Sequence, residues 1–242
     1  MRTSNSTADP KGEPLESTLE ARAELFQDAM GFSGIADREI QKLAAMATLR
    51  RFTKGQMIFE QDQPCDYFHL VASGLVKVYI CSASGFRMTY LLARRGEPLN
   101  LVGPFTGDPR FLCAEAMQAT DVAHIPRHDF VRFVADNPIL FSNIMAILSK
   151  AVDSANSRLI DMVEKRVEER LLRVLLTLLD KFGSEIRLTS AELAELAGTT
   201  VETTLRTMAR LRSLGIIESE RGQITIIRPA SLKNPERLPL WV

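Results

Sequence analysis

Hydrophobic and polar residues follow two different periods along the first half of the chain. From Leu19 to Ala47 the apolar residues recur at helical spacing, which predicts two short helices broken at Gly31–Gly34. From Thr48 to Ile125 short apolar runs alternate with turn residues, and Leu75–Tyr79 alternates with period two. This second stretch predicts a compact antiparallel β unit, a sandwich or a roll.

A long helix with a heptad pattern is predicted from Pro138 onward. Its apolar or small residues are spaced four and three apart, as in the seam of a coiled coil. Small side chains at these positions favour a partner helix and hence a homodimer; the alternative is packing against the chain's own β unit. The predicted dimerisation residues are Ile144, Leu148, Ala151, Ala155, Leu159 and Met162.

The last third of the chain has the pattern of a winged helix-turn-helix. A helical stretch, Val167–Phe182, ends at Gly183. Two shorter helices follow, Ala191–Ala197 and Val201–Leu214, and then two strand-like runs around Gly222. The sequences Thr189-x-x-Glu192 and Thr199-x-x-Glu202 are both predicted to be capping boxes that start the shorter helices. Two short helices joined by a tight turn and followed by a hairpin predict a DNA-binding fold.

These elements place the chain in the α+β class and divide it into four segments. Residues 1–18 are polar and are expected to be a disordered tail. Residues 19–137 form the β unit with its helices, and 138–166 the dimerisation helix. Residues 167–242 form the winged helix-turn-helix domain.

Net charge gives no general attraction to nucleic acid. Thirty Lys and Arg residues balance thirty Asp and Glu residues, so DNA binding has to depend on a local patch. Such a patch is present where Arg206, Arg210 and Arg212 lie close together without an acidic residue between them.

The second short helix carries the residue types that read base edges. Glu202 and Arg206 are four apart and share one helical face; a carboxylate accepts from cytosine N4 and a guanidinium donates to guanine or phosphate. The capping role predicted for Glu202 competes with base reading for the same carboxylate. The predicted DNA contacts are Thr189, Ser190, Thr200, Val201, Glu202, Thr203, Arg206, Arg210 and, at the wing tip, Arg221.

The segment Ala197-Gly-Thr-Thr-Val-Glu-Thr-Thr-Leu-Arg206 resembles the recognition turn of the Crp–Fnr superfamily of bacterial transcription regulators. Phe68–Val78 and Gly96–Leu101 are similar to that family's sensory β-roll. The resemblance implies a cyclic-nucleotide-binding-like β-roll (a double-stranded β-helix), a dimerisation helix, palindromic DNA and RNA polymerase as partners, and no enzymatic activity. Val201 stands where the fumarate–nitrate regulator also has Val, which implies a TTGA-type half-site, whereas Leu205 departs from that regulator's Ser.

The resemblance also indicates what the sensor does not bind. Cyclic-nucleotide members of the family use a Glu and an Arg-Ser pair; here Leu101 replaces the Glu, Phe111 replaces the Ser, and Arg110 remains. A cyclic nucleotide is therefore disfavoured, and a small organic or anionic effector, or haem, is expected instead. By the same resemblance, the lining residues of the effector pocket are Leu101, Arg110, Phe111, Ala155 and Asn156.

Haem-based sensing of nitric oxide or another gas is a further possibility that the resemblance raises. The possible axial donors are His69, His124, Met57 and Met88, of which His69 is the candidate, and the alternative for His69 is a buried core histidine. The family's iron–sulfur mechanism needs N-terminal cysteines, and none precedes Cys65. No cysteine or histidine spacing predicts a metal site.

Two other classes of protein are alternatives to a DNA-binding regulator. A cupin-type enzyme needs three or four His or Glu ligands on its strands, and the chain has three histidines in all. A ligand-binding regulatory module that does not touch DNA is the other alternative, against which the complete recognition helix argues. No apolar run approaches a membrane span. Cys65, Cys81 and Cys113 are an odd, widely spaced set that forms no disulfide framework, so a reducing cytoplasm is the expected location.

Overall fold

The computed structural model describes residues 11–232, which form two compact units. The first unit contains the chain up to Cys81 together with Leu91–Leu148. The second contains Ser82–Tyr90 and the chain from Ser149 onward. The predicted boundary between sensor and helix at residue 138 is thus not a boundary between compact units.

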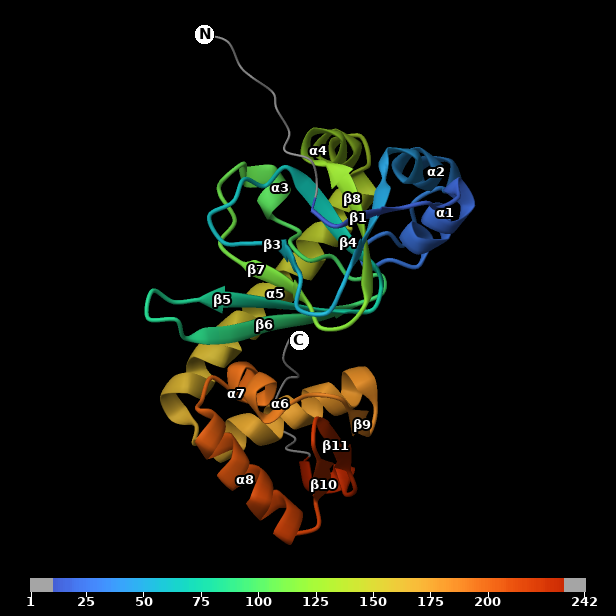
Figure 1. The fold of residues 1–242 in the computed structure, drawn as a ribbon. Helices are drawn as coiled ribbons and strands as arrows, with labels where there is room; N and C mark the ends of the chain where they lie inside the picture. Colours follow the sequence, from blue (N-terminus) through green and yellow to red (C-terminus); the bar gives the residue numbers. More distant parts are fainter. Residues whose placement is uncertain (1–10, 233–242) are drawn as a thin grey trace. The chain divides into compact units, whose positions relative to one another are not determined.

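The first unit is an antiparallel roll of two four-stranded sheets, as the sequence predicts (Figure 1). One sheet has the strand order β1-β2-β8-β4 and the other has β3-β7-β5-β6. The strands are β1 (Glu13–Leu15), β2 (Thr48–Phe52), β3 (Met57–Phe59), β4 (Tyr67–Ser73), β5 (Leu75–Cys81), β6 (Arg87–Arg94), β7 (Cys113–Ala116) and β8 (Thr120–Pro126).

Helices cover the outer face of the β4–β8 sheet. Phe68 of β4 stacks on Phe130 of α4 with ring centroids 3.9 Å apart, and Ile125 of β8 lies in the same buried cluster. Burial of such side chains supplies the main stabilisation of the unit. The helices are α1 (Leu19–Gln27), α2 (Asp37–Met46), α3 (Gly103–Thr106), α4 (Arg127–Ala135) and the first half of α5 (Pro138–Glu164).

The inner face of the same sheet points at the second sheet. Side chains alternate along a strand, so the neighbours of Phe68 and Ile125 in sequence face the other way. His69 and His124 are directly paired in the β4–β8 register, and the ring of His69 lies 5.2 Å from that of Phe59 in the other sheet. Both histidines therefore lie in the interior of the roll.

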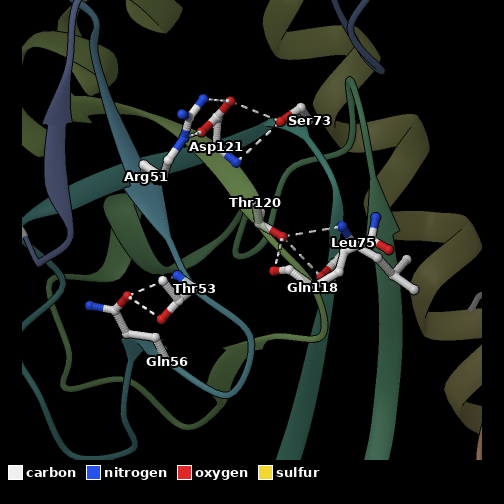
Figure 2. A network of polar contacts seen from close by, with 8 residues as sticks. All are labelled: Arg51, Thr53, Gln56, Ser73, Leu75, Gln118, Thr120 and Asp121. Carbon is white, nitrogen blue, oxygen red and sulfur yellow. Dashed lines mark hydrogen bonds and ion pairs between the residues drawn. The ribbon is translucent and has the colours of Figure 1, made fainter.

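The turn from β4 to β5 depends on a glycine and a threonine. Gly74 has a φ of +88°, and a Cβ there would collide with the side chain and backbone of Thr120. The Thr120 hydroxyl accepts from the amide of Leu75 at 3.3 Å and donates to the Gln118 carbonyl at 3.0 Å. Figure 2 shows this contact beside the Arg51–Asp121 ion pair, which joins β2 to β8. Gly74 thus packs against Thr120, the first residue of β8, and a β-bulge between Val71 and Ser73 separates this contact from the paired histidines.

The second unit contains a winged helix-turn-helix. Helices α6 (Val167–Phe182), α7 (Ser190–Ala197) and α8 (Val201–Ser213) precede a hairpin of β10 (Ile217–Glu220) and β11 (Gln223–Ile226), to which β9 (Glu185–Ile186) adds a third strand (Figure 1). A short 3-10 turn, Pro229–Leu232, follows the hairpin. The predicted helix Val167–Phe182 is confirmed at both ends.

The expectation of a disordered tail over residues 1–18 is wrong for its second half. Glu13–Leu15 form β1 and pair antiparallel with β2, and Thr18 caps α1. The first ten residues of that tail, and residues 233–242 of the DNA-binding segment, lie outside the described part of the chain.

Within residues 11–232 no single helix is long and apolar enough to cross a membrane. Helices α4 and α5 reach the length and apolar composition of a membrane span only when taken together, and the pair is bent by 107° at the break between them.

Candidate functional site

The helix-turn-helix begins with a capping box at Thr189, as predicted. The Thr189 hydroxyl accepts from the amide of Glu192 at 3.2 Å, and the Thr189 amide donates to the Glu192 carboxylate at 2.6 Å. This reciprocal pair satisfies two of the amides at the start of α7, those of Thr189 and Glu192. Ser190, half-buried, is the first residue of the helix.

The second capping box was placed one residue too early. Thr200, rather than Thr199, is the N-cap of α8, and its hydroxyl accepts from the amide of Thr203 at 3.2 Å. The carboxylate of Glu202 takes no part in the cap. The competition between capping and base reading is therefore removed, since the hydroxyl of Thr200 does the capping alone.

Glu202 and Arg206 lie exposed on α8 without a protein partner. Both side chains are open to solvent, and among the described residues neither makes a hydrogen bond or an ion pair. Val201 and Leu205, also four apart, are exposed apolar residues on the same helix. The first turns of α8 thus present a carboxylate, a guanidinium and two apolar side chains, all of them types that contact base edges.

The other predicted DNA contacts have different surroundings. Arg210 donates to the Glu168 carboxylate of α6 at 2.7 Å, so its guanidinium is engaged within the unit. Arg221 is exposed in the turn between β10 and β11, where the wing tip was predicted. Arg228, which is not among the predicted contacts, donates to the carbonyls of Leu214 and Gly215 and closes the C-terminal end of α8.

One arginine that the sequence analysis did not single out holds the turn in place. The Arg170 guanidinium donates to the carbonyls of Ala197 and Gly198 at 3.0 and 3.2 Å, and to that of Lys165 at 3.0 Å. It connects the start of α6 with the end of α7 and the residue after α5. A helix C-terminus leaves carbonyls unpaired and favours a cation, which is the physical reason for an arginine here.

The tip of the β5–β6 hairpin belongs to the same unit as the DNA-binding helices. Arg158 of α5 donates to the carbonyl of Thr89 at 2.8 Å, and the Thr89 hydroxyl donates to Glu195 of α7 at 3.3 Å. Burial lowers the pKa of Arg158 to about 10. The strands β5 and β6 of the roll thus lead directly into a segment that packs with the helix-turn-helix.

The predicted dimerisation seam is wrong in its first half. Ile144 is buried in the core of the roll, the alternative that the heptad pattern left open, and Leu148 packs against that core. Ala151 and Ala155 are half-buried, and the methyl end of Met162 lies against Gly198. Only Leu159 of the predicted set is largely exposed.

An exposed apolar stripe shares Leu159 with the predicted seam and lies one position away from it at Met145, Val152 and Val163. Its members are separated by four or seven residues, the spacing of one face of a coiled-coil helix. We call this set the apolar stripe of α5: Phe141, Met145, Val152, Leu159 and Val163. Large apolar side chains exposed in a row are typical of a protein interface.

The residues implied for the effector pocket are divided between the two compact units. Leu101 packs in the helix-covered core, whereas Arg110 is buried against the ring of Phe59 in the roll interior. Phe111 is 68% exposed. Ala155 and Asn156 lie on the half of α5 that belongs to the other unit.

The roll interior contains a group of buried polar side chains instead. The rings of His69 and His124 are 4.6 Å apart, and Arg110 donates to the carbonyl of Tyr67 at 3.1 Å. Burial, helped by the charge of Arg110, lowers the pKa of His69 well below its usual value. Burial also lowers the pKa of His124 to about 4. Both imidazoles are neutral at physiological pH.

His69 does not have the surroundings of a haem ligand. Its ring packs against the rings of Phe59, Tyr67 and His124. A porphyrin bound to His69 would have to displace this aromatic packing.

Lowering the pH should destabilise the protein through His124. The folded pKa of about 4 lies below the usual 6.5, so the unfolded chain takes up the proton first, and stability falls as the pH drops between these values. The expected loss is at most about 3 kcal/mol. Urea unfolding at about pH 7.5 and about pH 4.5 measures it. In the His124→Asn variant the free energy of unfolding should depend less on pH than in the wild type, whereas the surface variant His128→Asn should behave like the wild type. An equal change of the unfolding free energy between the two pH values in the wild type and both variants would contradict this assignment.

Models of two known domain families match the two halves of the chain. Residues 49–137 match the model of the cyclic nucleotide-binding domain and residues 169–234 that of the Crp-like helix-turn-helix domain. The cyclic AMP receptor protein of Thermus thermophilus is 26% identical, over 84% of this chain and 94% of its own.

Solved structures share the fold. The c-di-GMP responsive global regulator CLP of Xanthomonas campestris has a TM-score of 0.71 at 19% identity, covering 79% of this chain and 99% of its own. FixK2 of Bradyrhizobium japonicum has a TM-score of 0.69 at 22% identity, covering 77% and 95%.

Proposed function

Because this chain belongs to the Crp–Fnr family of DNA-binding transcription regulators, we propose that it binds a palindrome of two TTGA-type half-sites as a homodimer. The observation that carries the proposal is the exposed, unpaired Glu202–Arg206 face of α8, which the Thr200 cap leaves free. Family members are regulators rather than enzymes.

The side chains on α8 suit the chemistry of a TTGA half-site. The Glu202 carboxylate accepts from the N4 amino group of the cytosine that pairs with guanine, and the Arg206 guanidinium donates to guanine. Exposed Val201 and Leu205 offer apolar contact to thymine methyl groups. Thr200, Thr203, Thr189 and Ser190 lie at the helix starts, where hydroxyls and free amides contact phosphates and fix the register.

The apolar stripe of α5 supports the homodimer. Two copies pairing through this stripe would bury side chains that a single chain exposes. A two-fold dimer presents two α8 helices, which matches the symmetry of a palindrome. RNA polymerase is the further partner that this function implies.

The roll is the effector-binding part in this proposal. Its interior holds buried, incompletely hydrogen-bonded polar groups, which favour a small polar effector over haem. Effector binding would shift the population between two arrangements of the DNA-binding helices, with the hairpin tip Ser82–Tyr90 as a covalent connection.

Fluorescence anisotropy with labelled duplexes tests the proposal. The protein should bind a TTGA palindrome at least about 1000-fold more tightly than a scrambled duplex at the same salt concentration. Equal affinity for both duplexes would favour a ligand-binding module that does not read DNA.

A further inference from the structure

We propose that the interior of the roll takes up a small weak acid, binding its anion at Arg110 and its proton at His124. The inference rests on the proposed role of the roll as the sensor and names the chemical class of its effector. A carboxylic acid of a few heavy atoms, or nitrous acid, belongs to this class.

Unsatisfied buried atoms point to a missing ligand. In the described part of the chain four buried side-chain nitrogen or oxygen atoms lack a hydrogen-bond partner, and three of them belong to His69, Arg110 and His124. These atoms are His69 Nδ1, Arg110 Nη1 and His124 Nε2. Buried polar groups are nearly always hydrogen-bonded, so three such atoms in one interior are best explained by a polar guest.

The charge of Arg110 selects an anion. The side chain is buried, and its contacts are the Tyr67 carbonyl and the face of the Phe59 ring. Within residues 11–232 no carboxylate lies within ion-pair distance of it; Asp66 and the Cys65 thiol act on it only at longer range. A buried charge without a counter-charge is costly, and an anion on Nη1 would supply that counter-charge. The same guanidinium opposes a metal cation at the two imidazoles.

The tautomer of His124 explains why a proton accompanies the anion. Its Nδ1 lies 3.1 Å from the Val122 carbonyl, an acceptor, so Nδ1 carries the hydrogen and Nε2 keeps its lone pair. When the acid binds, its O–H bond breaks and an N–H bond forms at Nε2. The anion keeps the electron pair and accepts from Arg110 Nη1. No other reactant is needed, and the interior gains no net charge.

The surrounding charges keep the imidazoles of His69 and His124 unprotonated before the acid binds, and they couple the binding of the proton to that of the anion. Arg50 from β2 and Arg110 both oppose a proton on His124, and the neutral ring of His69 stands across from it on β4. An anion on Arg110 removes much of that opposition, so proton and anion are expected to bind together. The rings of Phe52, Phe59 and Tyr67 pack beside the two histidines, so the inference is confined to guests of a few heavy atoms.

Calorimetric titration of the full-length protein with acetate and with nitrite tests the inference. Titrations at about pH 6 in two buffers of different ionisation enthalpy should show uptake of about one proton per chain, and affinity should fall about tenfold per pH unit above neutrality. Chloride, the anion of a strong acid, should not bind. Chloride binding as tightly as acetate without proton uptake would overturn the role of His124.

Two variants and an NMR measurement test the role of Arg110 in binding the anion and that of His124 in binding the proton. Arg110→Gln should lose binding, whereas Arg95→Gln, which alters an arginine bound to the Ala72 carbonyl, should retain it. If Arg110→Gln fails to fold, nitrogen-15 NMR of the wild-type protein replaces it: the Nε2 signal of His124 should change from a lone-pair to a protonated nitrogen when acetate is added. No change in heat or in this signal would show that the interior holds only water. If the protein still binds the TTGA palindrome in that case, the proposed function stands and only this inference fails.

Discussion

Replacing Arg206 with Ala should weaken binding to a TTGA palindrome by about 2–6 kcal/mol, because a homodimer loses one base contact of about 1–3 kcal/mol in each half-site. Arg206 is exposed on α8 and has no protein partner among the described residues, so the substitution removes little from the fold itself. Binding to scrambled DNA should change much less, since that binding depends on phosphate contacts. Anisotropy on both duplexes measures the two effects.

Arg212→Ala is the matched control for this experiment. Arg212 is exposed in the last turn of the same helix, away from the N-terminal turns that reach base edges. Its loss should lower the affinity for both duplexes by a similar factor. If Arg206→Ala behaved in the same way as Arg212→Ala, the assignment of Arg206 as a base-reading residue would be incorrect.

Glutamates in the apolar stripe should convert the dimer to a monomer. Val152 and Leu159 are 57% and 65% exposed and lie seven residues apart, so a double Val152→Glu, Leu159→Glu variant places two like charges in each half of the interface. Loss of bivalent binding should reduce the affinity for a palindrome by at least about 100-fold. Light scattering gives the oligomeric state, and anisotropy gives the affinity.

Lys150→Glu controls for the added charge. Lys150 is exposed two residues before Val152 and therefore lies on nearly the opposite side of the helix. The Lys150→Glu variant should remain dimeric. A double variant that remains dimeric would exclude the apolar stripe as the interface.

The helix-turn-helix could be predicted from the sequence because its signals are local. Thr189 and Glu192 are close in sequence and sufficient to specify a helix start, and Val167–Phe182 has one clear apolar face. The error at α8 arose because Thr199 and Thr200 are both suitable caps. The end of α7 decided between them: the Thr199 amide donates to the Ala194 carbonyl and so still belongs to the closing turn of α7.

The seam of α5 could not be predicted because the helix has two apolar faces. Ile144 and Val152 fit heptad patterns shifted by one position, and nothing local decides which face the roll covers. Packing of the roll buries Ile144 and leaves Val152 exposed. Periodicity identifies an amphipathic helix but does not identify its partner.

The contact between the two interior histidines could not be predicted for a similar reason, although the buried core position that the sequence left open for His69 is confirmed. His69 and His124 are separated by fifty-five residues and meet only because β4 and β8 pair in one register. A shift of one residue would have turned either side chain to the helix-covered face. That register pairs two strands far apart in the sequence and shifts at a β-bulge between Val71 and Ser73, and no local signal specifies it.

Selection from a randomised duplex library tests the central claim most directly. The wild-type dimer, incubated with random DNA at physiological salt and sequenced after several rounds, should enrich a palindrome with TTGA in each half and centres about one helical turn apart. Enrichment of a palindrome with another core would refute the assignment of the half-site. No enriched palindrome at all would contradict the account of this chain as a dimeric reader of DNA.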